Sequence, residues 1–79
     1  MNVHIDSPEK NIWEGNAQSV SSVNSQGPFD ILAYHATFIT LIENQPIVIR
    51  DSEGKTLKFS FPHSVIFNRD NAVSVYTNI

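Results

Sequence analysis

The stretch Thr56-Leu57-Lys58-Phe59-Ser60-Phe61 alternates polar and apolar residues without interruption. An alternation of period two places every second side chain on one face of a β-strand, so this stretch predicts a strand with one buried face. The same alternation recurs at residues 3–5 (Val-His-Ile) and at residues 73–75 (Val-Ser-Val). Residues 47–49 (Ile-Val-Ile) form a β-branched run, which is typical of a strand that is covered on both faces or lies at an interface. These segments predict an all-β protein.

Turn signals separate the segments at short intervals. Residues 51–54 (Asp-Ser-Glu-Gly) fit a four-residue hairpin loop in which the glycine takes a positive φ. Asp70-Asn71 fits a two-residue hairpin, because both residue types tolerate the left-handed region. Residues 36–43 would also fit a short helix, but their Thr and Ile content and the nearby Pro46 favour a strand. Short strands divided by regular turns predict a flattened β-sandwich or barrel.

The apolar phase of each alternating segment predicts the core. We expect eight side chains to point inward: Val3, Ile5, Leu32, Leu57, Phe59, Phe61, Val73 and Val75. Trp13 has two interpretations. It fills the core beside Ile12, or it lies at an interface with another protein, where tryptophan often dominates binding.

Length and composition exclude several classes of protein. The 79 residues predict a single domain over residues 1–79, and the absence of cysteine leaves no disulfide framework or thiolate metal site. The net charge is −3 and the five basic residues are scattered, so we expect neither nucleic-acid binding nor a polybasic membrane anchor. The longest apolar run has four residues, and the N-terminus has no basic region followed by an apolar stretch. We therefore expect no membrane insertion and no signal peptide, and a cytosolic chain that is bacterial or organelle-encoded.

Few residues point to chemistry. His4, His35 and His63 lie about thirty residues apart, so no pair has the spacing of a metal site. No serine lies in a G-x-S-x-G turn, although a Ser-His-Asp triad assembled by the fold stays open. The three glycines are too widely spread for a phosphate-binding loop. We expect no catalytic residue, metal, cofactor or small-molecule ligand.

Residues 27–40 join a glycine turn, a short apolar strand, a histidine corner and a second apolar strand. Together with the flanking segments, this stretch resembles the N-terminal β-sandwich domain of the epsilon subunit of F-type ATP synthase. The matching positions are Gly27, Phe29, Ile31-Leu32, His35-Ala36 and Ile39-Thr40, with residues 3–8, 12–15, 65–67 and 70–75 in the flanking strands and corners. The resemblance covers essentially the whole chain.

The chain departs from the family pattern mainly at corners. Pro28 stands where an acidic residue is usual, and Asp30 where glycine is usual. Ala33-Tyr34 replaces the usual Pro-Gly, and Thr37 replaces a proline. The common Ser-Gly-Gly near the end is Pro-His-Ser at residues 62–64.

The chain also ends at Ile79, directly after the last expected strand. Most members of the family continue there into a C-terminal helical hairpin. We expect either a truncated chain or a naturally short member, and the absence of a tag sequence favours a natural end.

The resemblance implies a sandwich of about ten short strands and a role without catalysis. Such a subunit belongs to the central stalk of a proton-translocating ATP synthase and couples the gamma subunit to the membrane c-ring during ATP synthesis. It is peripheral, on the cytoplasmic face of the bacterial inner membrane or its organelle equivalent. Without the hairpin we expect no ATP binding. The alternatives are a stand-alone β interaction module with an unrelated partner, or a small β-barrel enzyme or ligand binder.

The resemblance also implies two contact regions. The expected gamma contacts are Ser7, Tyr34, His35 and Thr40, with Ser7 beside the His35 corner. The expected c-ring contacts are Ser25, Gln26, Gly27, Pro28 and Asp30. For His35 a second interpretation is that it only caps its turn. Tyr34 is bulkier than the usual glycine, so it either adds contact area or forces the corner outward.

Overall fold

The computed structural model of the protein describes residues 1–78 and shows an all-β chain. Its strands are β1 (Asn2–Asp6), β2 (Asn11–Asn24), β3 (Gly27–Leu32), β4 (Phe38–Glu43), β5 (Pro46–Asp51), β6 (Thr56–Ser60), β7 (His63–Arg69) and β8 (Ala72–Thr77). The all-β prediction is confirmed. The described residues form eight strands rather than about ten, because the 14-residue β2 takes part in two layers. They contain no helix long and apolar enough to cross a membrane. The expected natural end at Ile79 falls outside the described residues.

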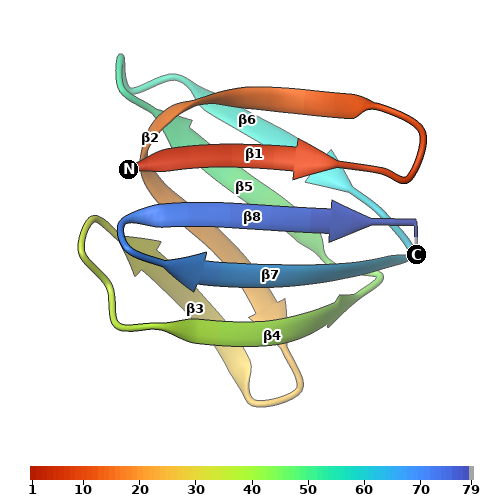
Figure 1. The fold of residues 1–79 in the computed structure, drawn as a ribbon. Helices are drawn as coiled ribbons and strands as arrows, with labels where there is room; N and C mark the ends of the chain where they lie inside the picture. The colour runs from red at the N-terminus through yellow and green to blue at the C-terminus, as the bar shows by residue number, and fades with distance from the viewer. Residues whose placement is uncertain (79) are drawn as a thin grey trace.

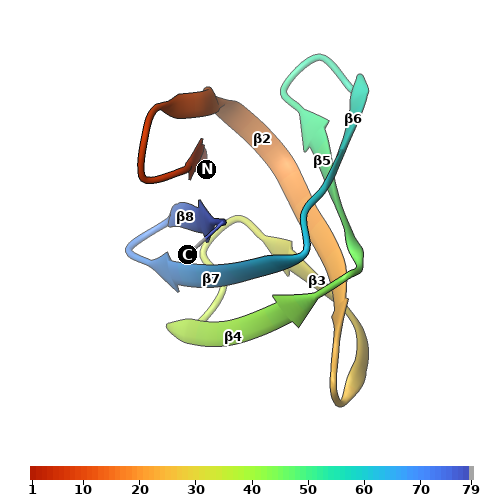
Figure 2. The ribbon, with the colours of Figure 1, turned by 90° about the vertical axis from the view of Figure 1, so that its right-hand side faces the viewer.

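The strands form two layers that share β2 (Figures 1 and 2). The front sheet has the order β4-β7-β8-β1 and continues into the first part of β2, residues 11–16. The back sheet contains the rest of β2, with β5 and β6 on one side and β3 on the other. All neighbours are antiparallel except β1 and β8, which are parallel. A register irregularity between Ala17 and Ser19 lies where β2 passes from one layer to the other.

Branched aliphatic side chains fill the space between the layers. The buried apolar residues are Val3, Ile5, Ala17, Val20, Ile31, Ile42, Ile47, Ile49, Ile66, Val73 and Val75. The predicted core positions at residues 3, 5, 73 and 75 are therefore confirmed. Leu57, Phe59 and Phe61 are only partly buried and pack against this core from its border.

The prediction for Leu32 is wrong, because this side chain is 57% exposed. Ile31, its neighbour on β3, is fully buried and pairs with the equally buried Val20. The inward phase of β3 therefore falls on odd-numbered residues. In a run of consecutive apolar residues, only packing against another strand selects which face is buried.

Trp13 belongs to the border of the core. It is partly buried and packs against the cluster, with its ring centroid 6.4 Å from that of Phe59. Gly15 leaves room for this ring, because a Cβ at that position would lie 2.9 Å from a ring carbon of Trp13. The core interpretation of Trp13 is therefore the better one.

The turns follow the sequence signals. Asp70 and Asn71 both have positive φ, 52° and 61°, in the predicted two-residue hairpin. Gly54 has a φ of 83° in the β5–β6 loop, where Asp51 Oδ1 accepts hydrogen bonds from two backbone N–H groups. Residues 38–43 form strand β4, as their composition predicted.

Candidate functional site

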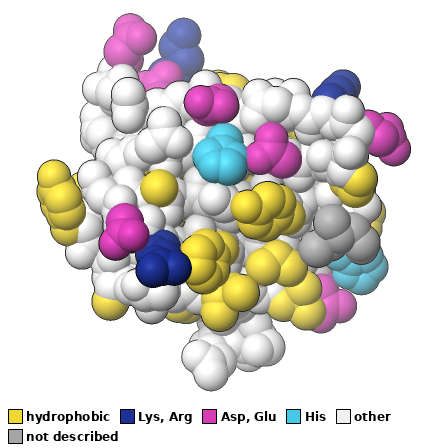
Figure 3. All heavy atoms as spheres, viewed as in Figure 1, with side chains coloured by type: hydrophobic (Ala, Val, Ile, Leu, Met, Phe, Trp, Pro, Cys, Tyr) yellow, Lys and Arg dark blue, Asp and Glu magenta, His cyan; other side chains and the backbone are white. Residues whose placement is uncertain are grey.

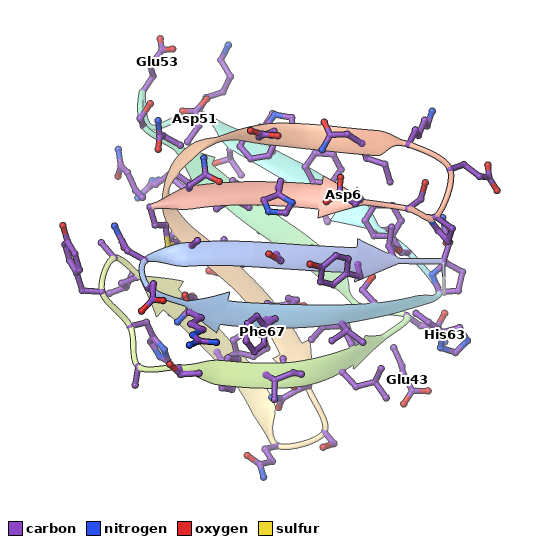
Figure 4. All side chains as sticks on the ribbon, viewed as in Figure 1. Asp6, Glu43, Asp51, Glu53, His63 and Phe67 are labelled. Atoms are coloured by element: carbon purple, nitrogen blue, oxygen red, sulfur yellow. The ribbon has the colours of Figure 1, made fainter. Side chains whose placement is uncertain are left out.

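The outer face of the front sheet carries exposed apolar side chains. On β4 the side chains of Ile39 and Leu41 point outward, at 66% and 54% exposure, while Ile42 is buried. Leu41 pairs with Val65 of β7, which pairs with Tyr76 of β8, and Ile39 pairs with Phe67. We call the set Ile39, Leu41, Val65, Phe67 and Tyr76 the apolar strip. Figure 3 shows hydrophobic side chains gathered over β4, β7 and β8, and Figure 4 shows Phe67 within this face.

A polar cluster borders the apolar strip on β1 and β8. His4 Nδ1 lies 2.7 Å from Asp6 Oδ2, and Ser74 Oγ lies 3.3 Å from His4 Nε2. Asn11 Nδ2 donates to Asp6 Oδ1 at 2.8 Å. The hydrogen bond from Asn11, and then that from His4, hold the pKa of Asp6 below its ordinary value of 3.8. We call His4, Asp6, Asn11 and Ser74 the His4 cluster.

The His4 cluster has the atom order of a Ser-His-Asp triad, but its surroundings do not support nucleophilic catalysis. Such catalysis needs hydrogen-bond donors aimed at the developing oxyanion. β1 and β8 are both interior strands, so their N–H groups point toward neighbouring strands. The hollow described below is lined by other residues. The His4 cluster is therefore a cross-strand hydrogen-bond network on a sheet face.

Hydrogen bonds hold the corner between β3 and β4 against the end of β7 and the β7–β8 turn. The Tyr34 backbone N–H donates to Asn71 Oδ1 at 2.9 Å, and Asn68 Nδ2 donates to the carbonyl oxygens of His35 and Ala36. Tyr34 has a φ of 61° and its side chain is 85% exposed. His35 Nδ1 lies 2.9 Å from the Ala36 carbonyl oxygen, which fits the interpretation that it caps the turn. Both side chains remain exposed.

The structure separates the four expected gamma contacts. Ser7 follows the Asp6 end of β1, whereas the Tyr34 corner adjoins Asn71, which lies by the Asn2 end of that strand. Ser7 is therefore not a neighbour of the corner. Its hydroxyl instead closes the β1–β2 turn by accepting a hydrogen bond from the Lys10 N–H.

Thr40 does not lie on the outer face of β4. Its side chain is half-buried on the inner side and accepts a hydrogen bond from Asn24 Nδ2 at 3.0 Å. Thr40 thus fixes the end of β2 against β4. The exposed positions on this strand are the flanking Ile39 and Leu41.

The five expected c-ring contacts lie together on the β2–β3 hairpin, which projects below β4 in Figure 1. Ser25 and Gln26 form the exposed tip, and Gly27 has a φ of 117° directly after it. Asn24 Oδ1 stabilises this turn by accepting from the Gln26 N–H at 2.9 Å. Pro28 and Asp30 are exposed on β3, where Asp30 accepts a hydrogen bond from the Ser21 hydroxyl.

A hollow of about 280 Å³ lies between β4 and the base of this hairpin. We call it the edge hollow. It is lined by Val23, Asn24, Ser25, Leu41, Glu43 and Gln45. Over residues 1–78, no group of three or more His, Asp or Glu side chains is placed to hold a metal ion.

The apolar strip and the His4 cluster were not expected from the sequence. The strip residues come from β4, β7 and β8, and of these strands only β8 had a predicted inward phase, at Val73 and Val75. Ser74 and His4 are 70 positions apart and meet only through the parallel pairing of β1 and β8. Two signals were available: Ile39 and Leu41 alternate with Thr40, and Tyr76 follows the inward Val75.

Fold and surface together define a small β-sandwich domain with an exposed apolar strip on its front sheet. The family model of the ATP synthase delta/epsilon chain β-sandwich domain matches residues 1–79 of the chain. The chain belongs to this family.

Curated relatives share this family. The chain is 33% identical to the ATP synthase epsilon chain of Leptospira borgpetersenii over 78 residues, which cover 99% of this chain and 61% of the relative. It is 32% identical to that of Clostridium botulinum strain Alaska E43 over 71 residues, covering 87% of this chain and 53% of the relative. The chain spans 53% to 64% of the length of such relatives.

Two solved mitochondrial ATP synthases contain a chain of similar fold. The match to a chain in the Euglena gracilis enzyme has a TM-score of 0.87 at 13% identity and covers 95% of this chain and 48% of that one. The match in the Tetrahymena thermophila central stalk and c-ring has a TM-score of 0.79 at 14% identity, covering 98% and 62%. At these identities the likeness shows the fold alone.

Proposed function

We propose that this chain serves as a non-catalytic central-stalk component of an F-type ATP synthase, coupling the gamma subunit to the c-ring during ATP synthesis. Family membership and the epsilon chains among its relatives support this role. The observation that carries it is the apolar strip, exposed on a sheet that closes a packed core. A contiguous exposed apolar patch on a soluble domain marks a surface for a partner.

The gamma contact, in this proposal, runs over the apolar strip and the Tyr34-His35 corner. The strip lies on the neighbouring strands β4, β7 and β8, and the corner leads into β4 and is hydrogen-bonded to Asn68 of β7, so one partner can touch them together. Interfaces have an apolar core and a polar rim, and the His4 cluster supplies such a rim on the β1 side. On β4 the proposed contact residues are Ile39 and Leu41 in place of the predicted Thr40, and Ser7 lies outside this contact.

The c-ring contact falls on the β2–β3 hairpin. Its exposed tip projects beyond the sandwich, away from the strands that carry most of the apolar strip (Figure 1). The two surfaces adjoin at the edge hollow, which Leu41 and Ser25 both line, and otherwise lie on different strands, so the domain can hold two partners at once. The chain would then lie peripherally at the cytoplasmic face of a bacterial inner membrane, or at the equivalent membrane of an organelle.

Two exposed leucines provide a matched test of the gamma contact. Leu41, at 54% exposure, belongs to the apolar strip, and Leu32, at 57%, lies outside it on β3. We expect Leu41→Ser to weaken binding to the gamma subunit by about tenfold, the effect of removing one interface side chain worth about 1–2 kcal/mol. Leu32→Ser should bind as the wild type does. Affinity is measured by surface plasmon resonance on immobilised gamma, with circular dichroism to confirm that both variants fold.

The experiment can contradict the proposal in two ways. Equal weakening by Leu32→Ser and Leu41→Ser would show that the apolar strip is not the contact. A wild-type chain that does not bind gamma would contradict the stalk role itself. The apolar strip would then belong to an interaction module with another partner.

A further inference from the structure

Three strands end the sheets within residues 1–78, and β4 is the one with no proline and no charged side chain before its last residue. β3 carries Pro28, which has no N–H to donate, and the charged Asp30, while β6 carries the exposed Lys58. Such residues are how sheet edges avoid further pairing. β4 pairs with β7 alone and reads Phe-Ile-Thr-Leu-Ile-Glu, with no proline and no lysine. Its outer edge is therefore suited to accept another strand.

The edge hollow adjoins this same edge. Leu41 and Glu43 of β4 form one wall, and residues 23–25 at the end of β2 form the other. Glu43 takes part in no ion pair among the described residues, although His63 is its cross-strand neighbour. Figure 4 shows Glu43 projecting from the end of β4. The hollow thus combines a carboxylate with the oxygens of nearby amide and hydroxyl side chains.

These oxygens define what the hollow can bind. Glu43 accepts hydrogen bonds only, and the Gln45 amide and the Ser25 hydroxyl can each accept more. A lysine or arginine side chain offers donors and the complementary charge. The apolar wall, from Val23 and Leu41, suits the aliphatic stem of such a side chain.

We propose that the open edge of β4 binds an extended segment of the stalk partner as an additional antiparallel strand, with a basic side chain in the edge hollow. This inference rests on the proposed function and names how the partner is held. Residues opposite one another in an antiparallel pair lie on the same face. The segment therefore carries apolar residues opposite Ile39 and Leu41, which widen the apolar strip, and a lysine or arginine opposite Glu43.

A short peptide tests the recognition chemistry directly. The blocked peptide Lys-Thr-Val-Thr-Val-Thr places its lysine opposite Glu43 and its valines opposite Leu41 and Ile39. Titrated into the ¹⁵N-labelled 79-residue chain, it should slow the exchange of alternate β4 amides, those that face the open edge. Replacing its lysine by glutamate should weaken binding by about tenfold, the usual effect of losing one charge-assisted hydrogen bond.

Variants of the chain test the contributions of the β4 edge and of the edge hollow to peptide binding separately. Glu43→Gln should remove most of the preference for the lysine peptide over the glutamate peptide. Glu53→Gln changes an exposed carboxylate in the distant β5–β6 loop and should leave this preference unchanged. Leu41→Lys places a positive charge inside β4, whose one charged residue is the terminal Glu43, and should abolish peptide binding. Each change lies at an exposed position, so folding is preserved.

Three results would overturn the inference. The first is that the peptide changes the chemical shifts of β3 or β6, and the second is that it changes those of the apolar strip without slowing hydrogen exchange of the β4 amides. The third is that Glu43→Gln still prefers the lysine peptide. β4 amides that become protected as the chain alone is concentrated would also overturn it, since a second copy would then occupy the edge.

The complex with gamma separates this inference from the stalk role. Binding to gamma with unchanged exchange of the β4 amides contradicts only the inference. Peptide binding at β4 without any binding to gamma contradicts only the stalk role.

Discussion

At the scale of single residues, Tyr34 occupies a backbone conformation that costs free energy. Its φ of 61° lies in the left-handed region, which a residue with a Cβ enters at a cost of about 1–2 kcal/mol. The hydrogen bond from its N–H to Asn71 Oδ1 helps to hold this conformation. Strained residues that persist at a surface often serve a contact, and the 85% exposed ring is placed for one.

Asp6 gives the folded state a dependence on pH. Its carboxylate accepts hydrogen bonds from Asn11 and His4, so its pKa is lower in the folded chain than the ordinary 3.8. A lowered pKa contributes stability that is complete above the unfolded value and is lost as the pH falls through the folded value. The free energy of unfolding should therefore decrease as the pH falls below 3.8.

Asp6→Asn isolates this effect, because asparagine resembles the protonated acid. We expect the variant to be less stable than the wild type at about pH 6 and to approach it at about pH 2.5. Urea denaturation followed by Trp13 fluorescence measures the free energy of unfolding of variant and wild type at each pH. For Glu9→Gln, a change in the exposed β1–β2 turn, the free energy of unfolding should depend on pH as it does for the wild type. If the free energies of unfolding of Asp6→Asn and the wild type differ by the same amount at all pH values, the pKa of Asp6 is not lowered by folding.

At the scale of elements, the border of the core is aromatic. Trp13 of β2 packs against Phe59 of β6, and Phe59 stacks on Phe61 with centroids 6.3 Å apart. These contacts attach β6, one of the two edge strands of the back sheet, to the strand that joins the two layers. The side chains are only partly buried, so their contribution is smaller than that of a central aliphatic residue.

Phe59→Ala should lower the free energy of unfolding by about 2–3 kcal/mol, less than the roughly 3–5 kcal/mol of a fully buried phenylalanine. Ile49→Ala, at a fully buried position on the neighbouring β5, serves as the comparison and should cost about 3–4 kcal/mol. Chemical denaturation followed by circular dichroism gives both values. A Phe59→Ala chain with unchanged stability would contradict the assignment of Phe59 to the border of the core.

At the scale of the whole molecule, the two proposed contacts lie on different parts of a rigid sandwich. The apolar strip belongs to the front sheet, whereas the β2–β3 hairpin extends the back sheet and projects past β4. A single packed core connects both surfaces. A load applied to one surface is therefore carried to the other through close-packed side chains.

The c-ring contact can be tested through its salt dependence. Asp30 is exposed, and interactions between exposed charges weaken over about 8–10 Å at moderate ionic strength. Asp30→Lys should reduce attachment of the chain to a purified c-ring more at low salt than at high salt, while gamma binding stays unchanged. Equal attachment of variant and wild type at both ionic strengths would show that Asp30 is not part of the contact.

The sequence by itself determined the all-β class, the turns at residues 51–54 and 70–71, the core positions at both ends of the chain and the family. These features depend on local properties, since side-chain alternation and turn preference act over a few neighbouring residues. Only the tertiary structure decided which face of β3 and β4 is buried, and so placed Leu32 outside and Thr40 inside. It alone paired β1 with β8, which assembled the His4 cluster, and it left β4 as an open edge. The physical reason is that the two faces and edges of a strand are equivalent until a neighbouring strand covers one of them.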